Sequence, residues 1–220
     1  ELEEVKKAYE SGHSKLMVGF NRRFSPIAQD LKKRFEGANE PLVINIRVNA
    51  GFIPKDHWTQ IEEVGGGRIV GEMCHFIDLM QFFTDSKPVT VYADCINSEN
   101  AKIKPDDNIS VIVKFKDGSI GNLVYVANGD KALPKEQIEI FCAGKIGVIN
   151  DFRGGVLYIG NKVEKLKHTG KGHKQEVLAF MEALKSNGDS PIEFKSIYNT
   201  TMVTFKIQDS LKTGLPQKIS

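Results

Sequence analysis

A series of short β-type runs separated by tight turns dominates the chain after residue 88. The runs span residues 89–95, 109–116, 120–126, 137–142, 145–149, 156–159 and 163–167. Asp117-Gly118 and Gly160-Asn161 lie between adjacent runs, where tight hairpin turns are expected. Because strands joined by hairpins pair antiparallel, most of the predicted sheet is not built from βαβ crossovers.

Helical periodicity flanks these runs on both sides. Apolar residues recur at helical spacing in several segments, which predicts helices over 1–11, 24–35, 68–83 and 173–186, and a last helix from Ser196, the expected N-cap, to about 213. Leu16–Phe20 and residues 41–50 are predicted as strands, the first one buried. The layout predicts an α+β domain with a large open, mainly antiparallel sheet and helices on one face.

Composition and charge exclude several classes of protein. The 220 residues are 40% hydrophobic with a formal net charge of +2, which argues against a disordered tail and against binding to nucleic acid or an anionic membrane. No apolar run approaches the length of a membrane span, and the start lacks the apolar core of a signal peptide. The three cysteines form no CxxC motif, so we expect no metal site and a reducing, cytoplasmic location.

The helix predicted over 68–83 is hard to explain by packing alone. Glu72, His75 and Asp78 follow one another at i, i+3 and i+6 on one side of an otherwise apolar helix. An isolated buried carboxylate costs several kcal/mol unless it is paired or changes its pKa. The three side chains therefore face one another, a cation or a polar cavity, and the last case describes an acid/base site. A purely structural role for His75 and Asp78 is an equally good interpretation.

Other candidate residues lie on loops. Asn21, Arg22 and Arg23 follow the Leu16–Phe20 run, at a joint between predicted elements where ligands often bind, although an arginine pair is more often salt-bridged. Trp58 is expected either to border a pocket or to anchor its loop. Gly65-Gly66-Gly67 has the wrong spacing for a dinucleotide fingerprint, and the chain contains neither GxGxxG nor GxxxxGK[ST].

Three segments carry a family resemblance. GFNRRFSP at 19–26, GGGRIVGEMCHFID at 65–78 and the final DSPIEFKSIYNTTMVTFKIQDSLKTGLP resemble the second half of the Gfo/Idh/MocA sugar and inositol oxidoreductases. The resemblance implies a dihydrodipicolinate reductase-like C-terminal domain at residues 21–220, which binds substrate and forms oligomers. Residues 1–20 would be a remnant of a Rossmann domain that binds NAD or NADP, and the chain is expected to be a piece of a longer protein.

The resemblance also implies roles for individual residues. His75 maps to the family's catalytic histidine, Asp78 to a substrate-contacting acid, and Arg22 or Arg23 to the basic residue that follows the strand. Glu72 and Trp58 are further candidates for substrate binding, and Asn21 and Gly71 for contact with the cofactor. The family's acid four residues before the histidine is replaced by Gly71, and its catalytic lysine, from an upstream Glu-Lys-Pro segment, is absent.

The leading hypothesis is the substrate side of an NAD(P)-dependent oxidoreductase that acts on a sugar, sugar nucleotide or cyclitol, inactive as this piece alone. A homo-oligomer formed through the open sheet face is expected. The alternative is a non-catalytic dimerisation module, favoured by apolar residues on both faces of the 109–116 strand. Metal-dependent hydrolysis is disfavoured, because Glu72, His75 and Asp78 spread over about 120° of the helix.

Overall fold

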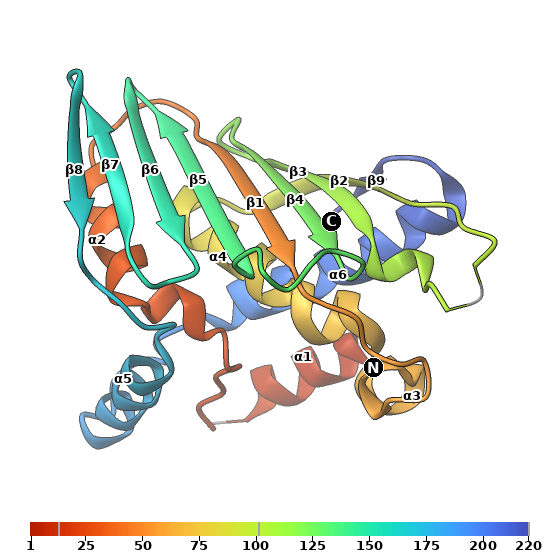
Figure 1. The fold of residues 1–220 in the computed structure, drawn as a ribbon. Helices are drawn as coiled ribbons and strands as arrows, with labels where there is room; N and C mark the ends of the chain where they lie inside the picture. Colours follow the sequence, from red (N-terminus) through yellow and green to blue (C-terminus); the bar gives the residue numbers. More distant parts are fainter. Residues whose placement is uncertain (13, 101, 220) are drawn as a thin grey trace.

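A nine-stranded sheet with helices gathered on one side makes up the chain (Figure 1). The computed structural model describes residues 1–12, 14–100 and 102–219. The helices are α1 (Leu2–Ser11), α2 (Pro26–Phe35), α3 (Glu62–Gly65), α4 (Cys74–Thr84), α5 (His173–Lys185) and α6 (Phe194–Thr213), with 3₁₀ turns η1 (Asn21–Phe24), η2 (Trp58–Gln60) and η4 (Pro105–Asp107) and a π-helical turn, η3 (Ile69–Met73). Among the described residues, no helix is both long and apolar enough to cross a membrane.

The sheet consists of two antiparallel meanders joined by a single strand. Its strands are β1 (Val43–Asn49), β2 (Pro88–Cys95), β3 (Ile109–Phe115), β4 (Ile120–Val126), β5 (Glu136–Cys142), β6 (Lys145–Asn150), β7 (Gly155–Ile159), β8 (Lys162–Leu166) and β9 (Gln217–Lys218), in the order β8-β7-β6-β5-β1-β4-β3-β2-β9. β1 runs parallel to β4 and antiparallel to β5, and every other pair is antiparallel. The predicted α+β class, the mainly antiparallel sheet and the one-sided helices are confirmed.

The core lies between the sheet and the helices. Strand residues alternate in burial, so that Ile44, Ile46 and Val48 of β1 point inward and are 2% exposed or less. α4 is buried along most of its length and packs against α6, which in turn packs on β2. Because α4 is in the core, any polar group on it needs a partner or an opening.

The other face of the sheet carries a continuous apolar row. The strand register aligns Val163, Tyr158, Ile146, Phe141, Val43 and Ile120 across β8, β7, β6, β5, β1 and β4. Val163, Tyr158 and Val43 are 61%, 41% and 41% exposed. We call these six residues the open-face row.

Two predictions about element boundaries are wrong. Leu16–Phe20 is not a strand, because no other strand lies beside it to share backbone hydrogen bonds. Phe20 instead packs with Ile192 and Ile197. The last helix begins at Phe194 with Glu193 as N-cap, and the hydroxyl of Ser196, the predicted cap, accepts a hydrogen bond from Arg23.

The helix predicted over 68–83 begins with a turn of a different kind. Residues 69–73 form the π-helical turn η3, and the α-helical pattern starts at Cys74. Glu72 is bonded to Lys135 and Tyr125, whereas Asp78 is bonded to Arg23, so the two carboxylates have different partners.

Candidate functional site

His75 lies in the first turn of α4, near charged side chains that include Arg22, Glu72 and Glu136. Its ring is half-buried and meets the Phe20 ring edge-on, with centroids 5.7 Å apart. The ring nitrogen Nδ1 is buried and has no hydrogen-bond partner, which is not the case for Nε2. Burial and the positive charge of Arg22 lower the pKa of His75 to about 4, although Glu72 and Glu136 act to raise it. The imidazole is therefore neutral at pH 7 and able to accept a proton.

Glu72 is the centre of a half-open network that also contains Arg68, Tyr125 and Lys135. The Lys135 ammonium lies 2.5 Å from Glu72 Oε1 and the Arg68 guanidinium 3.2 Å from Oε2. The Tyr125 hydroxyl donates to Glu72 and accepts from Arg68 Nε at 2.5 Å. The side chains of Glu72 and Lys135 remain 22% and 38% exposed, so this network reaches the surface.

The groups of the half-open network change one another's pKa values. Burial acts to raise the pKa of Glu72, but the hydrogen bonds from Lys135 and Tyr125 outweigh it and lower that pKa. Burial and the Glu72 carboxylate raise the pKa of Tyr125. At neutral pH the network therefore presents an ionised carboxylate and an ammonium group beside a neutral phenol.

A second network, which we call the sealed network, joins the buried Arg22–Glu136 pair to Lys171, whose side chain is 31% exposed. The Arg22 guanidinium binds both oxygens of Glu136, at 2.8 and 2.9 Å, and stacks over the Phe76 ring at 4.4 Å. Lys171 reaches the same carboxylate at 2.5 Å. The Glu136 side chain is 0% exposed. Burial acts to raise the pKa of Glu136, but its bonds to Arg22 and Lys171 lower it to about 2.

A second sealed pair joins η1 to α4. Arg23 donates to both oxygens of Asp78, at 2.8 and 2.5 Å, and Asp78 is 0% exposed. Burial raises the pKa of Asp78 to about 6, and the neighbouring Arg23 opposes that rise. The pair fixes η1 against the core helix.

Three of the residues predicted to bind substrate form ion pairs in this structure. Arg22, Arg23 and Asp78 are committed to buried ion pairs, and no hydrogen-bonding oxygen of Asp78 is left for a substrate. The salt-bridged alternative for the arginine pair is the one observed. Trp58 is 60% exposed on η2, and its ring lies 5.9 Å from that of His57, apart from both networks. His75 Nδ1 has no hydrogen-bond partner, and Glu72, although both of its oxygens are bonded, is 22% exposed.

The two residues predicted to contact a cofactor have local structural surroundings of their own. Asn21 is 3% exposed, and its amide donates to the Lys171 carbonyl at 2.7 Å. A Cβ at Gly71 would lie 3.1 Å from the Gly65 carbonyl, so close approach of backbone explains this glycine. Within the described ranges, no group of three or more His, Cys, Asp or Glu side chains is placed to hold a metal ion.

Sequence reasoning missed most of the partners in these networks. Arg68, Tyr125, Lys135, Glu136 and Lys171 come from segments far apart in the chain. Tyr125 and Glu136 follow the alternation of their strands like core residues, so no local signal marks them. The assembled site offers a neutral imidazole beside a carboxylate and an ammonium group, a set that can bind and deprotonate a hydroxyl.

Comparisons with known proteins match this architecture. Residues 39–149 match the model of the GFO/IDH/MocA C-terminal domain. The chain is 22% identical to the uncharacterized oxidoreductase YrbE of Bacillus subtilis (strain 168), over 93% of this chain and 63% of that protein. It therefore spans less than two thirds of the length of this curated relative.

Solved structures show the same fold. An NAD binding oxidoreductase from Klebsiella pneumoniae superposes with a TM-score of 0.80 at 17% identity, over 100% of this chain and 70% of that one. The UDP-N-acetylglucosamine 3-dehydrogenase GnnA from Acidithiobacillus ferrooxidans superposes with a TM-score of 0.77 at 17% identity, over 96% and 66%. The chain belongs to the GFO/IDH/MocA family, whose C-terminal domain it contains.

Proposed function

We propose that this chain is the substrate side of an NAD(P)-dependent oxidoreductase that transfers hydride to or from a sugar, sugar nucleotide or cyclitol. The observation that carries the proposal is the half-buried His75 imidazole on α4, whose Nδ1 has no hydrogen-bond partner and which lies near the charges of Arg22 and Glu72. His75 accepts the hydroxyl proton of the substrate in the oxidative direction. Glu72 and Lys135 supply an acceptor and donors for neighbouring hydroxyls, as a polyol requires.

Family membership and the names of similar proteins support this substrate class. The matching structures include the UDP-N-acetylglucosamine 3-dehydrogenase and a protein described as an NAD binding oxidoreductase. The nicotinamide, when bound, supplies or accepts the hydride. Since Asn21 and Gly71 have other partners, we assign the dinucleotide to a domain outside the described residues.

Two surfaces without a partner in the described chain support a separate dinucleotide-binding domain. Residues 1–20 would be a part of that domain. The Leu16–Phe20 run is half-exposed and pairs with no strand. α5 presents an apolar stripe of Val177, Leu178, Met181 and Leu184, which are 59%, 56%, 46% and 46% exposed. Contact with a further domain would cover both surfaces and complete a site that is inactive in this chain alone.

Replacing His75 in the full-length protein tests the proposed function. His75→Gln is expected to lower turnover of a sugar or cyclitol substrate by about 10²–10⁴-fold, because the proton acceptor is lost. Binding of NADH, followed by its fluorescence, stays unchanged. His168→Gln, at a 55% exposed histidine, serves as the matched control. Turnover within twofold of the parent enzyme in His75→Gln would remove His75 from the chemistry.

A second function, assembly through the sheet, is favoured by the open-face row. A continuous line of exposed apolar side chains is typical of an interface between copies. Val43→Glu is expected to convert a dimer or larger oligomer to a smaller species in sedimentation velocity runs. Leu215→Glu, at a 62% exposed leucine outside the sheet, leaves the oligomer intact. An unchanged sedimentation coefficient in Val43→Glu would exclude this face as the interface.

A further inference from the structure

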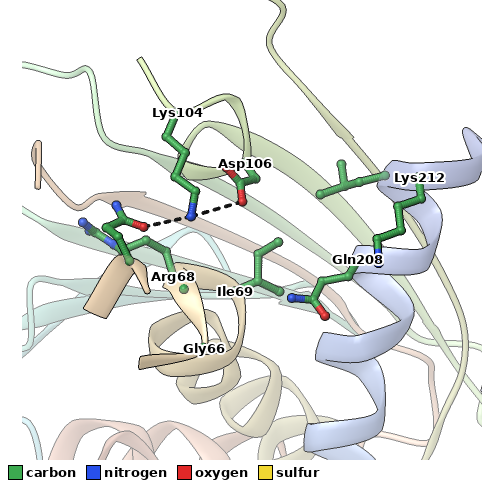
Figure 2. A pocket seen from close by; sticks show the side chains of 10 residues that line it. Gly66, Arg68, Ile69, Lys104, Asp106, Gln208 and Lys212 are labelled. Atoms are coloured by element: carbon green, nitrogen blue, oxygen red, sulfur yellow. Dashed lines mark hydrogen bonds and ion pairs between the residues drawn. The ribbon is translucent and has the colours of Figure 1, made fainter. Parts of the chain in front are cut away.

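A cavity of about 300 Å³ is lined in part by Arg68, one member of the half-open network. Figure 2 shows it between the loop that carries Lys104 and Asp106 and the last turns of α6. Its walls are formed by Gln60, Gly66, Gly67, Arg68, Ile69, Lys104, Asp106, Gln208, Leu211 and Lys212. None of the residues assigned to substrate above lines it, so it needs an explanation of its own.

The ammonium group of Lys104 is held in place at one wall. Its Nζ lies 3.1 Å from Gln60 Oε1 and 3.5 Å from Asp106 Oδ2 (Figure 2). Gln60 is itself 8% exposed and donates to Asp107 at 2.5 Å. This chain of bonds fixes the Lys104 charge at the cavity before any ligand arrives, which lowers the entropic cost of binding.

The opposite wall provides a second ammonium group and a free amide. Lys212 and Gln208 extend from α6 toward the cavity (Figure 2). In the part of the chain that the structure describes, neither side chain makes a hydrogen bond or an ion pair. Both groups are therefore available to a ligand that lies between the walls.

Glycine keeps the space beside Lys104 open. Gly67 has a φ of +70°, and a Cβ at this position would lie 3.7 Å from Lys104 Nζ. Any other residue would thus place a side chain against the ammonium group and would adopt an unfavourable backbone conformation. The backbone of Gly67 can approach a ligand closely.

The charges around the cavity favour a phosphate group. Two ammonium groups face one carboxylate, and the Arg68 guanidinium is committed to Tyr125 and Glu72. Lysine binds phosphate oxygens as a point charge, and one phosphate has enough oxygens to accept from Lys104, Lys212 and the Gln208 amide together, whereas a carboxylate has only two. Ile69 and Leu211 add apolar surface for an organic part. We propose that this cavity binds a phosphate group carried by a small organic molecule.

The test follows binding by NMR at constant ionic strength, with inorganic phosphate as the first probe. Phosphate is expected to shift the amide signals of Gly66 and Gly67. Lys104→Gln and Lys212→Gln are each expected to weaken binding about tenfold, because each removes one charge-assisted bond. Lys185→Gln, at an exposed lysine on α5, is the matched control and leaves the affinity unchanged.

Three outcomes would overturn the proposal. The first is that Lys212→Gln binds inorganic phosphate as tightly as the parent chain does. Lys212 lies on the exposed side of α6, so this substitution does not threaten folding. The second is an equal shift with acetate, which would contradict the choice of phosphate. The third is equal affinity for glucose 6-phosphate and inorganic phosphate, since the ester is expected to bind more tightly by covering Ile69 and Leu211. His75→Gln is expected to bind phosphate normally, so this result stands apart from the oxidoreductase proposal.

Discussion

The two charged networks beside His75 contain similar groups but differ in their access to solvent. In the sealed network, Glu136 is 0% exposed and Arg22 is 8% exposed, although the third member, Lys171, is 31% exposed. In the half-open network, the side chains of Glu72 and Lys135 are 22% and 38% exposed. A buried ion pair fixes geometry and is costly to break, whereas a partly solvated pair can exchange its partner for a ligand. This difference favours our proposal that the Arg22–Glu136 pair supports the site and that the Glu72–Lys135 pair contacts substrate.

The largest expected effect comes from breaking the sealed network. Arg22→Ala leaves the Glu136 carboxylate buried with only Lys171 beside it. The expected loss in the free energy of unfolding is about 3–5 kcal/mol, measured by urea denaturation. Arg153→Ala removes an arginine that is 84% exposed, and we expect it to change stability by less than about 1 kcal/mol. Similar losses in the two variants would contradict the distinction between the networks.

A smaller effect is expected in the half-open network. Tyr125→Phe removes the hydroxyl that joins Arg68 to Glu72 and leaves the buried Arg68 Nε without its acceptor. We expect a loss of about 1–3 kcal/mol in denaturant unfolding. Tyr158→Phe, at a 41% exposed tyrosine on β7, is the control and stays within about 0.5 kcal/mol. A loss as large as that of Arg22→Ala would mean that both networks are equally structural.

The smallest effect concerns the pH dependence of His75. Its pKa falls from 6.5 to about 4 on folding, so the unfolded chain takes up a proton first as the pH decreases. The parent chain therefore loses stability between pH 6.5 and pH 4, and His75→Gln lacks this contribution. Because the ring is only partly buried, we expect the difference in unfolding free energy between the two to change by about 1 kcal/mol across this window. A difference that does not vary with pH would show that His75 titrates normally in the native state.

The sequence predicted the sheet well because its signals are local. Alternation and turn residues such as Asp117-Gly118 define each hairpin without reference to distant parts of the chain. The same reasoning failed at Leu16–Phe20, where an apolar run has no strand beside it. Helix boundaries that depend on tertiary contacts were also predicted wrongly. Ser196 was expected to cap α6, but its hydroxyl accepts a hydrogen bond from Arg23.

The candidate site was only partly predictable for a related reason. His75 and Glu72 could be selected, because polar groups stand out on an apolar helix. Asp78, however, is bonded to Arg23, whereas Glu72 is bonded to Lys135 and Tyr125. Lys135 and Tyr125 reach Glu72 only through the pairing of β1 with β4 and β5, and no spacing in the sequence encodes that pairing.

The position of β1 has a consequence for the order in which the chain folds. Apart from the short β9, each meander is made of strands that are neighbours in sequence, but β1 pairs only with β4 and β5, which follow it much later in the chain. During synthesis β1 must wait until residue 142 has left the ribosome before both of its edges are satisfied. Long-range pairing of this kind slows folding and favours a populated intermediate. We expect the two meanders to gain protection from hydrogen exchange before the β1 amides, so that the single sheet closes in the last step.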